Sequence, residues 1–402
     1  MGKVYLVAAK RTPIGSFGGA FKTVAAPSLA AAAVKGVLKE ANVAPENIDE
    51  LLMGNVIAAG QGMGPGRQAA IEAGLPNEVP AYTVNMICGS GMKVVMDGAA
   101  HIKAGDAELV VACGGENMSR YPYIVTSDIR FGTKMGSINM SDSLIDDGLT
   151  DVFNQYHMGI TAENIAEQVG VTRQEQDDFA LQSQLRAVSA IEAGKFEQEI
   201  VPVEVTVRRK SQLVNVDEYP KADATEEGLA KMRPAFKKDG TVTAANASGL
   251  NDGGSAILLA SEAAVAKHGL KPIAELVSYG QAGLDPAIMG LGPVPAIKVA
   301  LSKAKLSLQD IGLLELNEAF AAQALGVMKE LAQEHQEPLT SLASRTNVNG
   351  GAIALGHPLG ASGNRILVTL LHEMQKRGEE YGLASLCIGG GMGTAVIVKA
   401  LS

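Results

Sequence analysis

Hydrophobic and polar positions along the chain change repeatedly between a strand pattern and a helix pattern. Apolar runs at residues 4–9, 51–56 and 109–113 predict buried strands. Ser28 can cap a helix over residues 29–41, because a serine oxygen accepts a hydrogen bond from a free N–H of the first turn. This alternation of strands and helices predicts the α/β class.

The alternation weakens in the middle of the chain. Residues 119–247 are richer in charge and irregular sequence, and regular alternation resumes after Ser248. Within this segment, Thr172 and Glu175 form a capping-box pattern that predicts a long helix to about residue 193. We therefore expect the segment to be an insertion or a separate lid.

The two regular parts resemble each other. Three matches occur in the same order: residues 41–53 with 304–316, Gly-Ser-Gly at 89–91 with Ala-Ser-Gly at 361–363, and residues 109–115 with 384–390. Chance similarity between strand–helix units is the alternative, but three ordered matches favour a duplication. A duplicated fold brings equivalent loops together, and a binding site can form between them.

Cys88 is the first candidate for chemistry. It lies in Asn-Met-Ile-Cys-Gly-Ser-Gly, between a strand-like stretch (81–86) and a helix-like one (89–104). A thiol at a helix N-terminus is expected to favour the thiolate, and the small residues after it let a substrate approach closely. The alternative is a buried cysteine that acts only as a small apolar side chain.

Composition narrows the function classes. The chain has 402 residues, with 47% hydrophobic and 19% charged residues, and a formal net charge of -9, which argues against a general nucleic-acid binder. Its three cysteines form no CxxC pair, so we expect neither a zinc site nor a disulfide framework. No apolar run reaches the roughly 20 residues of a membrane helix, and no signal peptide pattern is found, so we expect a cytoplasmic protein that does not bind membranes.

Three unusual segments follow in the C-terminal part. They are Asn-Glu-Ala-Phe-Ala at 317–321, a glycine-rich loop with Gly-His-Pro-Leu-Gly-Ala-Ser-Gly at 356–363, and Cys-Ile-Gly-Gly-Gly-Met-Gly at 387–393. Taken alone, Cys387 would be read as core filling, Asn317 as a helix cap and His357 as either structural or functional. Their combination with the Cys88 segment is far more specific than any one of them.

Together, these segments resemble the thiolase family, and within it the acetyl-CoA acetyltransferases, over essentially the whole chain. The resemblance implies the thiolase fold, in which duplicated βαβαβαββ halves give α-β-α-β-α layers and carry an inserted loop domain. The implied division is residues 1–118 with 248–271 for the N-terminal half, 119–247 for the loop domain, and 272–402 for the C-terminal half.

The resemblance also implies the catalytic roles. Cys88 is the nucleophile that carries the acyl group, and His357 takes its proton and later polarises a thioester oxygen. Cys387 is the second acid/base and removes the α-proton. Asn317 holds a water that forms one oxyanion hole with His357, and the N–H groups of Cys88 and Gly389 form the other. Cys113 lacks the glycine-rich continuation and is expected to be structural.

Coenzyme A thioesters are the implied substrates and products, with no prosthetic group and no metal. The implied binding residues are His157, Met158, Lys221, Phe236, Ala244, Ser248, Gly249, Met289, Ala319 and Phe320. Lys221 stands where relatives often carry arginine, and Gly228 where a serine contact to the adenine is common. Lysine keeps the charge for phosphate but loses planar stacking.

The implied reaction is the reversible condensation of two acetyl-CoA to acetoacetyl-CoA and CoA. The alternative is a degradative 3-ketoacyl-CoA thiolase for longer chains, but the bulky cluster of Met158, Phe236, Met289 and Phe320 favours a short acyl group. The Cys387 segment argues against ketoacyl synthases and hydroxymethylglutaryl-CoA synthases, and the intact motifs argue against a non-catalytic scaffold. Residues 121–141 resemble a tetramer-forming loop, so we expect a homotetramer.

Overall fold

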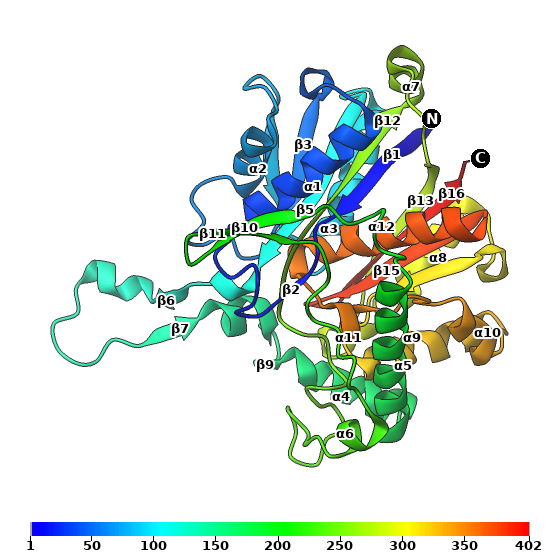
Figure 1. Cartoon of the computed structure of the whole chain (residues 1–402). Helices are drawn as coiled ribbons and strands as arrows, with labels where there is room; N and C mark the ends of the chain where they lie inside the picture. The colour runs from blue at the N-terminus through cyan, green and yellow to red at the C-terminus, as the bar shows by residue number, and fades with distance from the viewer. Residues whose placement is uncertain (1, 402) are drawn as a thin grey trace.

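The computed structural model describes residues 2–401 and confirms the α/β class that the hydrophobic pattern predicts (Figure 1). The first half consists of β1 (Val4–Arg11), α1 (Ala26–Ala41), β3 (Glu50–Gly54), α2 (Pro65–Ala73), β4 (Ala81–Val84), α3 (Ser90–Ala104), β5 (Leu109–Asn117) and β12 (Asn251–Ser261). The short β2 (Gly15–Ser16) pairs with the start of β12. This order is the predicted βαβαβαββ unit.

The second half repeats the unit with one strand reduced. It consists of β13 (Ala274–Gly283), α8 (Pro293–Ala304), β14 (Leu313–Leu316), α9 (Ala321–Glu334), α10 (Leu339–Ser344), α11 (Ala352–Leu355), α12 (Leu359–Arg377), β15 (Tyr381–Ile388) and β16 (Met392–Ala400). At the position that corresponds to β4, the second half has no strand and makes only a single parallel bridge between Thr346 and Leu314. The strand ends there because Asn347 takes a left-handed conformation (φ 46°) and its side chain bonds both the N–H and the C=O of Leu316.

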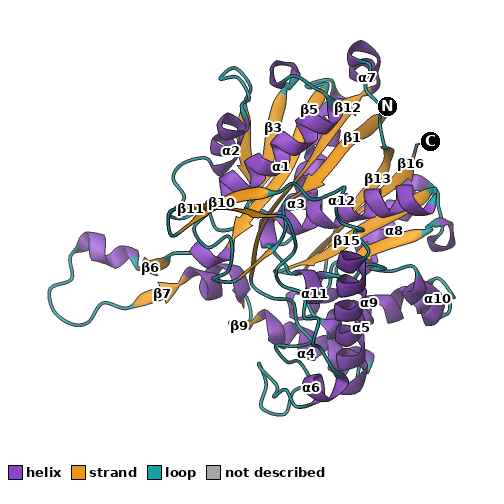
Figure 2. Ribbon diagram, viewed as in Figure 1, coloured by secondary structure: helices purple, strands orange, loops and turns teal. Residues whose placement is uncertain are grey.

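The predicted five layers are confirmed (Figure 2). The sheet runs in the order β14-β15-β16-β13-β1-β12-β5-β3-β4, and the two halves join where β1 pairs with β13 through only two residue pairs. Helices α1 and α2 cover one outer face, α8 and α9 cover the other, and α3 and α12 lie between the two halves. The repeated glycines allow that central contact, since a Cβ on Gly363 would lie 2.5 Å from the backbone nitrogen of Met92.

Of the two helix caps predicted from the sequence, the structure confirms one and contradicts the other. The capping box at Thr172 is confirmed, and it opens α5 (Arg173–Glu192). The Ser28 cap is wrong: α1 begins three residues earlier, with Pro27 in its first turn, and the Ser28 hydroxyl donates to Glu72 instead. Proline fits a first helical turn because the missing N–H would have no partner there.

The helices of the inserted segment lie below the sheet in Figure 1, where they pack on α9, α11 and residues 286–291. Its elements are β6 (Tyr123–Val125), β7 (Met140–Asp142), β8 (Thr150–Asp151), β9 (Tyr156–His157), α4 (Met158–Val169), α5, β10 (Val203–Val207), β11 (Lys210–Val214) and α6 (Glu226–Ala230), and α7 (Glu262–His268) follows β12. The β6–β7 hairpin projects away from the body. Within residues 2–401, no helix is both long and apolar enough to cross a membrane. The residue limits of the three domains stay a prediction.

Candidate active site

Cys88 lies in the tight turn that joins β4 to α3. Ile87, just before it, takes a left-handed conformation (φ 49°), which is rare for a β-branched residue and is typical of strained functional turns. The Ser90 hydroxyl holds the turn, because it accepts from the Met86 N–H (2.8 Å) and donates to the Ile87 carbonyl (2.6 Å). A Cβ on Gly89 would lie 2.4 Å from Cδ1 of Ile388, so the turn packs directly on the end of β15.

The expectation that Cys88 favours the thiolate is wrong for this structure. Burial raises the pKa of the Cys88 thiol to about 11, although the backbone N–H groups of Gly389 and of Cys88 itself oppose the shift. Glu116, a buried carboxyl beneath the site, raises the pKa further. Desolvation therefore outweighs the favourable backbone dipoles, and the resting nucleophile is a thiol that needs a base.

His357 is the predicted base. Its backbone N–H donates to Asn251 Oδ1 (2.9 Å), and its Nδ1 lies 2.6 Å from the Ser362 hydroxyl. When the Ser362 hydroxyl donates to the Pro358 carbonyl (2.9 Å), Nδ1 carries the imidazole proton and Nε2 holds the lone pair. Burial and the charge of Arg365 lower the pKa of His357 to about 3, so the imidazole is neutral at physiological pH.

Asn317 and Cys387 stand at the carboxyl ends of the paired parallel strands β14 and β15. The Asn317 N–H donates to the Ser385 carbonyl (3.0 Å), and the Asn317 amide nitrogen lies 3.5 Å from His357 Nε2. Asn317 does not cap α9, whose N-cap is Phe320. Its Oδ1 is buried with no hydrogen-bond partner among the described residues, so it can accept from a water. Burial raises the pKa of the Cys387 thiol well above its usual range, and the Cys88 thiol contributes.

Apolar side chains wall the space beside Cys387. One buried cluster contains Cys387 with Met158, Met289, Ala319 and Phe320. A Cβ on Gly389 would lie 3.5 Å from the Met158 sulfur. The structure therefore gathers these predicted residues and Cys387 in one apolar cluster.

A stack of aromatic rings extends this wall. The His157 ring lies on the Phe236 ring, with centroids 4.6 Å apart, and Phe236 meets Phe320 edge-on at 6.2 Å. A Cβ on Gly159 would lie 2.2 Å from the Phe236 ring, so this stack requires a glycine at that position. His157 Nδ1 accepts from the Gly159 N–H (3.0 Å), so the neutral imidazole carries its proton on Nε2.

A cavity of about 380 Å³ connects these walls with His357. The predicted residues that line it are His157, Phe236, Ala244, Ser248, Gly249, Phe320 and His357. The strand-like contact of residues 246–249 with Phe320 holds one side, where the Ser248 N–H donates to the Ala319 carbonyl (3.0 Å). The shape of this cavity therefore depends on backbone pairing between the inserted segment and the C-terminal half.

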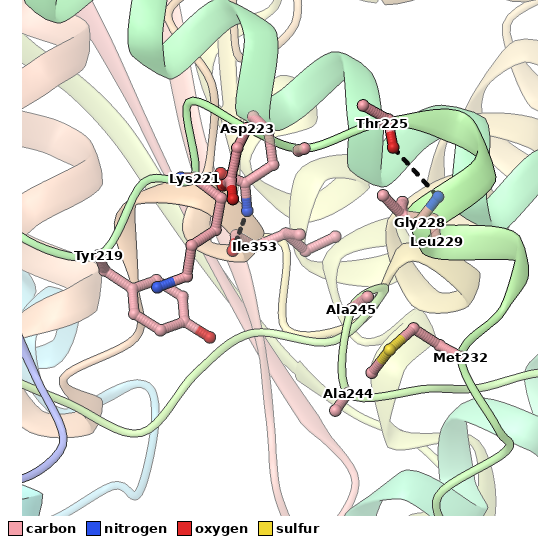
Figure 3. Close-up of a pocket in the computed structure, with 12 residues that line it drawn as sticks. Tyr219, Lys221, Asp223, Thr225, Gly228, Leu229, Met232, Ala244, Ala245 and Ile353 are labelled. Atoms are coloured by element: carbon pink, nitrogen blue, oxygen red, sulfur yellow. Dashed lines mark hydrogen bonds between the residues drawn. The ribbon is translucent and has the colours of Figure 1, made fainter.

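A second cavity, of about 300 Å³, adjoins the first through Tyr219 and Ala244 (Figure 3). Lys221 and Gly228 line it, and the Lys221 ammonium lies over the Tyr219 ring, 5.0 Å from its centroid. A cation on a ring face is attractive, so the lysine is held at the cavity wall.

Sequence reasoning missed several residues of the site. Ser362 belongs to the Gly-His-Pro motif, and its spacing from His357 was a usable signal. Tyr219 gave no signal, because it lies in an irregular stretch and only the fold brings it to Gly249, where a Cβ would lie 2.3 Å from the ring. Cys113 is fully buried in the core between β5 and α1. In the described part of the chain, no group of three metal-ligating side chains is found.

Comparison with family models covers nearly the whole chain. Residues 4–263 match the model for the thiolase N-terminal domain, and residues 270–400 match that for the thiolase C-terminal domain.

Full-length relatives agree with these matches. The acetyl-CoA acetyltransferase of Chromobacterium violaceum is 54% identical, over 99% of each chain. The crystal structure of human mitochondrial 3-ketoacyl-CoA thiolase in complex with CoA has a TM-score of 0.94 at 47% identity and covers 100% of this chain and 98% of its own. The acetyl-CoA acetyltransferase of Syntrophomonas wolfei has a TM-score of 0.96 at 39% identity, with both chains covered completely.

Proposed function

The chain belongs to the thiolase family, and from this premise we propose that it is an acetyl-CoA C-acetyltransferase. It condenses two acetyl-CoA molecules to acetoacetyl-CoA and free CoA, reversibly, through an acetyl group held on Cys88. The observation that carries the proposal is the position of His357, whose Nε2 lies 3.5 Å from the Asn317 amide nitrogen, at a cavity that the predicted residues Phe236 and Phe320 also line. The identity of more than half with a full-length relative of this name supports it.

In the first half-reaction, Cys88 attacks the thioester carbonyl of acetyl-CoA. His357 Nε2 takes the thiol proton as the S–C bond forms, because a thiol with a pKa of about 11 is not ionised beforehand. The bond to CoA then breaks, and Cys387 gives its proton to the departing thiolate. The N–H groups of Cys88 and Gly389 stabilise the oxyanion during the transfer.

In the second half-reaction, the Cys387 thiolate removes an α-proton from a second acetyl-CoA. Asn317, through a water, and the imidazolium of His357 stabilise the enolate oxygen. The carbanion attacks the acetyl carbonyl, the carbon–carbon bond forms and the bond to Cys88 breaks. The Cys88 thiolate recovers its proton from His357, so that every proton is returned.

The two adjoining cavities suit an elongated thioester. The acyl end lies beside His357 and the Met158, Met289 and Phe320 wall, and the pantetheine crosses Ser248 and Gly249. The nucleotide lies in the second cavity near Lys221, where the ammonium supplies charge for a phosphate. Because Gly228 offers no side chain and Lys221 no planar group, we expect charge rather than stacking to hold this end.

The second candidate is a 3-ketoacyl-CoA thiolase for longer chains. The similarity to the human mitochondrial enzyme favours it. Thiolysis of a 3-ketoacyl-CoA series by the full-length protein decides between the two. Highest kcat/KM on acetoacetyl-CoA supports the first proposal, and highest kcat/KM on chains of eight carbons or more contradicts it.

We also propose a cytoplasmic homotetramer. The projecting β6–β7 hairpin supports it, because Phe131 (86% exposed) and Met135 (95% exposed) leave large apolar side chains for another subunit to cover. Sedimentation of the wild type against Phe131→Asp tests the assembly. A tetramer that Phe131→Asp weakens supports the proposal, and a wild-type monomer contradicts it. The three free thiols fit a reducing compartment.

A further inference from the structure

Glu116 is a fully buried residue near the end of β5. Its Oε2 accepts from two backbone groups, the N–H of Val56 (2.8 Å) and the N–H of Gly360 (2.9 Å). Its Oε1 accepts from the side-chain amide of Asn55 (2.9 Å). Because Val56 and Gly360 are far apart in the sequence, one carboxylate oxygen joins two segments that only the fold brings together.

The bond to Val56 continues to the turn that carries Cys88. The Val56 carbonyl accepts from the side-chain amide of Asn85 (2.9 Å), and Asn85 Oδ1 accepts from the Ile87 N–H (2.9 Å). Ile87 is the residue with the left-handed conformation (φ 49°) that sets the direction of the chain just before Cys88. Glu116, Val56 and Asn85 therefore form a chain of hydrogen bonds that ends one residue before the thiol.

The bond to Gly360 holds the first turn of α12, three residues after His357. A Cβ on Gly360 would lie 2.6 Å from Glu116 Oε2 and 2.8 Å from the Asn55 Cα, so only a glycine allows this approach. A Cβ on Gly54 would likewise lie 2.6 Å from the Gly360 carbonyl oxygen. The backbone that follows His357 is therefore packed directly on the end of β3.

Cys88 also packs on an apolar cluster to which both segments contribute. This cluster includes Val56 and Leu359. Val56 is itself bonded to Glu116, and Leu359 directly precedes Gly360, which is bonded to the same oxygen. A shift of either segment would therefore change the surroundings of the thiol.

A role limited to stability is the alternative for Glu116, and Glu163 illustrates such a role. Glu163 is also buried, and it accepts from the backbone N–H groups of Thr241 (2.8 Å) and Val242 (2.8 Å). Neither of the two segments that Glu163 joins contains a residue with a proposed catalytic role. The two carboxylates thus make similar bonds, but those of Glu116 lead to the turn of the nucleophile and to the loop of its base.

We propose that Glu116 is a positioning residue that holds the Cys88 turn and the His357 loop at a fixed distance, so that His357 can take the thiol proton. The carboxylate acts through its reach, because one oxygen must meet the N–H groups of Val56 and Gly360 at the same time. A misplacement of about 1 Å between reacting groups can cost about 10²-fold in rate. This inference rests on the proposed thiolase reaction.

The test shortens the carboxylate and, separately, removes its charge. Glu116→Asp keeps the charge but withdraws the oxygens by about 1.5 Å, the length of one carbon–carbon bond, so that they cannot reach both N–H groups. Glu116→Gln keeps an oxygen of the same reach and loses the charge. Burial raises the pKa of the Glu116 carboxyl to about 7, so most of it is ionised in the wild type at pH 8, where the variants are compared.

The readout is the rate at which iodoacetamide alkylates Cys88. We expect this rate to fall about 10²-fold in Glu116→Asp and by a smaller factor in Glu116→Gln. A larger loss in Glu116→Gln would overturn the inference, because charge rather than reach would then matter. Glu163→Asp is the matched control, and it is expected to lower the melting temperature (Tm) without slowing alkylation. A loss of rate in Glu163→Asp equal to that in Glu116→Asp would also overturn the inference.

A double-mutant cycle with His357→Ala separates positioning from a general distortion. If Glu116 acts through the geometry between thiol and imidazole, Glu116→Asp slows alkylation when His357 is present and has no further effect in His357→Ala. An equal loss in the two backgrounds would overturn the inference.

Asn85→Ala gives a second test that leaves the buried carboxylate in place. Asn85 is exposed, so the loss of its side chain is expected to leave the fold intact while it breaks the link from Val56 to Ile87. We expect the same loss of alkylation rate, again only when His357 is present. An unchanged rate in Asn85→Ala would overturn the inference.

Alkylation of Cys88 does not require turnover, so the inference and the proposed function can fail separately. A wild type that shows the coupling to His357 but does not condense acetyl-CoA contradicts the proposed function and leaves the role of Glu116 standing. An active wild type without the coupling does the reverse.

Discussion

Ser362→Ala tests how the site fixes the histidine tautomer. The Ser362 hydroxyl accepts from His357 Nδ1 at 2.6 Å and donates to the Pro358 carbonyl. Its removal leaves a buried N–H without a partner, which costs about 1–3 kcal/mol. The imidazole can avoid that cost only by moving its proton to Nε2, and it then cannot accept the Cys88 proton. Either way, the acylation rate is expected to fall by about 5- to 150-fold, with little change in KM.

The assay is rapid-mixing release of CoA from acetyl-CoA, which reports acylation of Cys88 separately from condensation. Ser278→Ala is the matched control, because Ser278 is also buried and its hydroxyl donates to a single backbone carbonyl, that of Ala300, far from the site. Ser362→Thr keeps a hydroxyl and is expected to recover most of the rate. Acylation at the wild-type rate in Ser362→Ala, or an equal loss in Ser278→Ala, would refute the tautomer argument.

Three further predictions concern binding, pH and the second half-reaction. Gly249→Ala forces the Tyr219 ring away from a Cβ that would lie 2.3 Å from it, so KM for acetyl-CoA should rise about five-fold or more. Gly148→Ala is the control, because its methyl would meet nothing closer than 3.9 Å, and an equal KM in both variants contradicts the prediction. Because the pKa of His357 is lowered to about 3, the imidazole stays neutral as pH falls, and wild-type kcat/KM should show no ordinary histidine inflection near pH 6.5; such an inflection contradicts the burial argument. Cys387→Ala should still acylate but lose about 10²–10⁴-fold in condensation, and equal loss in both steps would contradict the division of labour.

The candidate site residues that lie within sequence motifs could be predicted from the sequence. Cys88 follows β4, Asn317 follows β14, and Cys387 is the second-last residue of β15. Periodicity indicated the strands, and the resemblance to the thiolase family singled out these three residues. The Gly91 and Gly363 repeat likewise marked the close contact of α3 and α12, although its steric reason became visible only in the fold.

What could not be predicted depends on contacts between distant segments. The pKa of Cys88 follows from how deeply the thiol is buried, and a helix N-terminus in the sequence does not reveal desolvation. Tyr219 reaches the cavity only because the inserted segment folds over Gly249. The second half also loses a strand at Thr346, where the turn at Asn347 overrides the repeat.

The most direct measurement is the mass of the peptide that contains residue 88 after the protein is mixed with acetyl-CoA and quenched in acid. We expect one acetyl group on this peptide in the wild type and in Cys387→Ala, and none anywhere in Cys88→Ala. A wild-type protein that stays unmodified on Cys88, or that carries the acetyl group on Cys387 instead, would contradict the assignment of the nucleophile and with it the mechanism built on it.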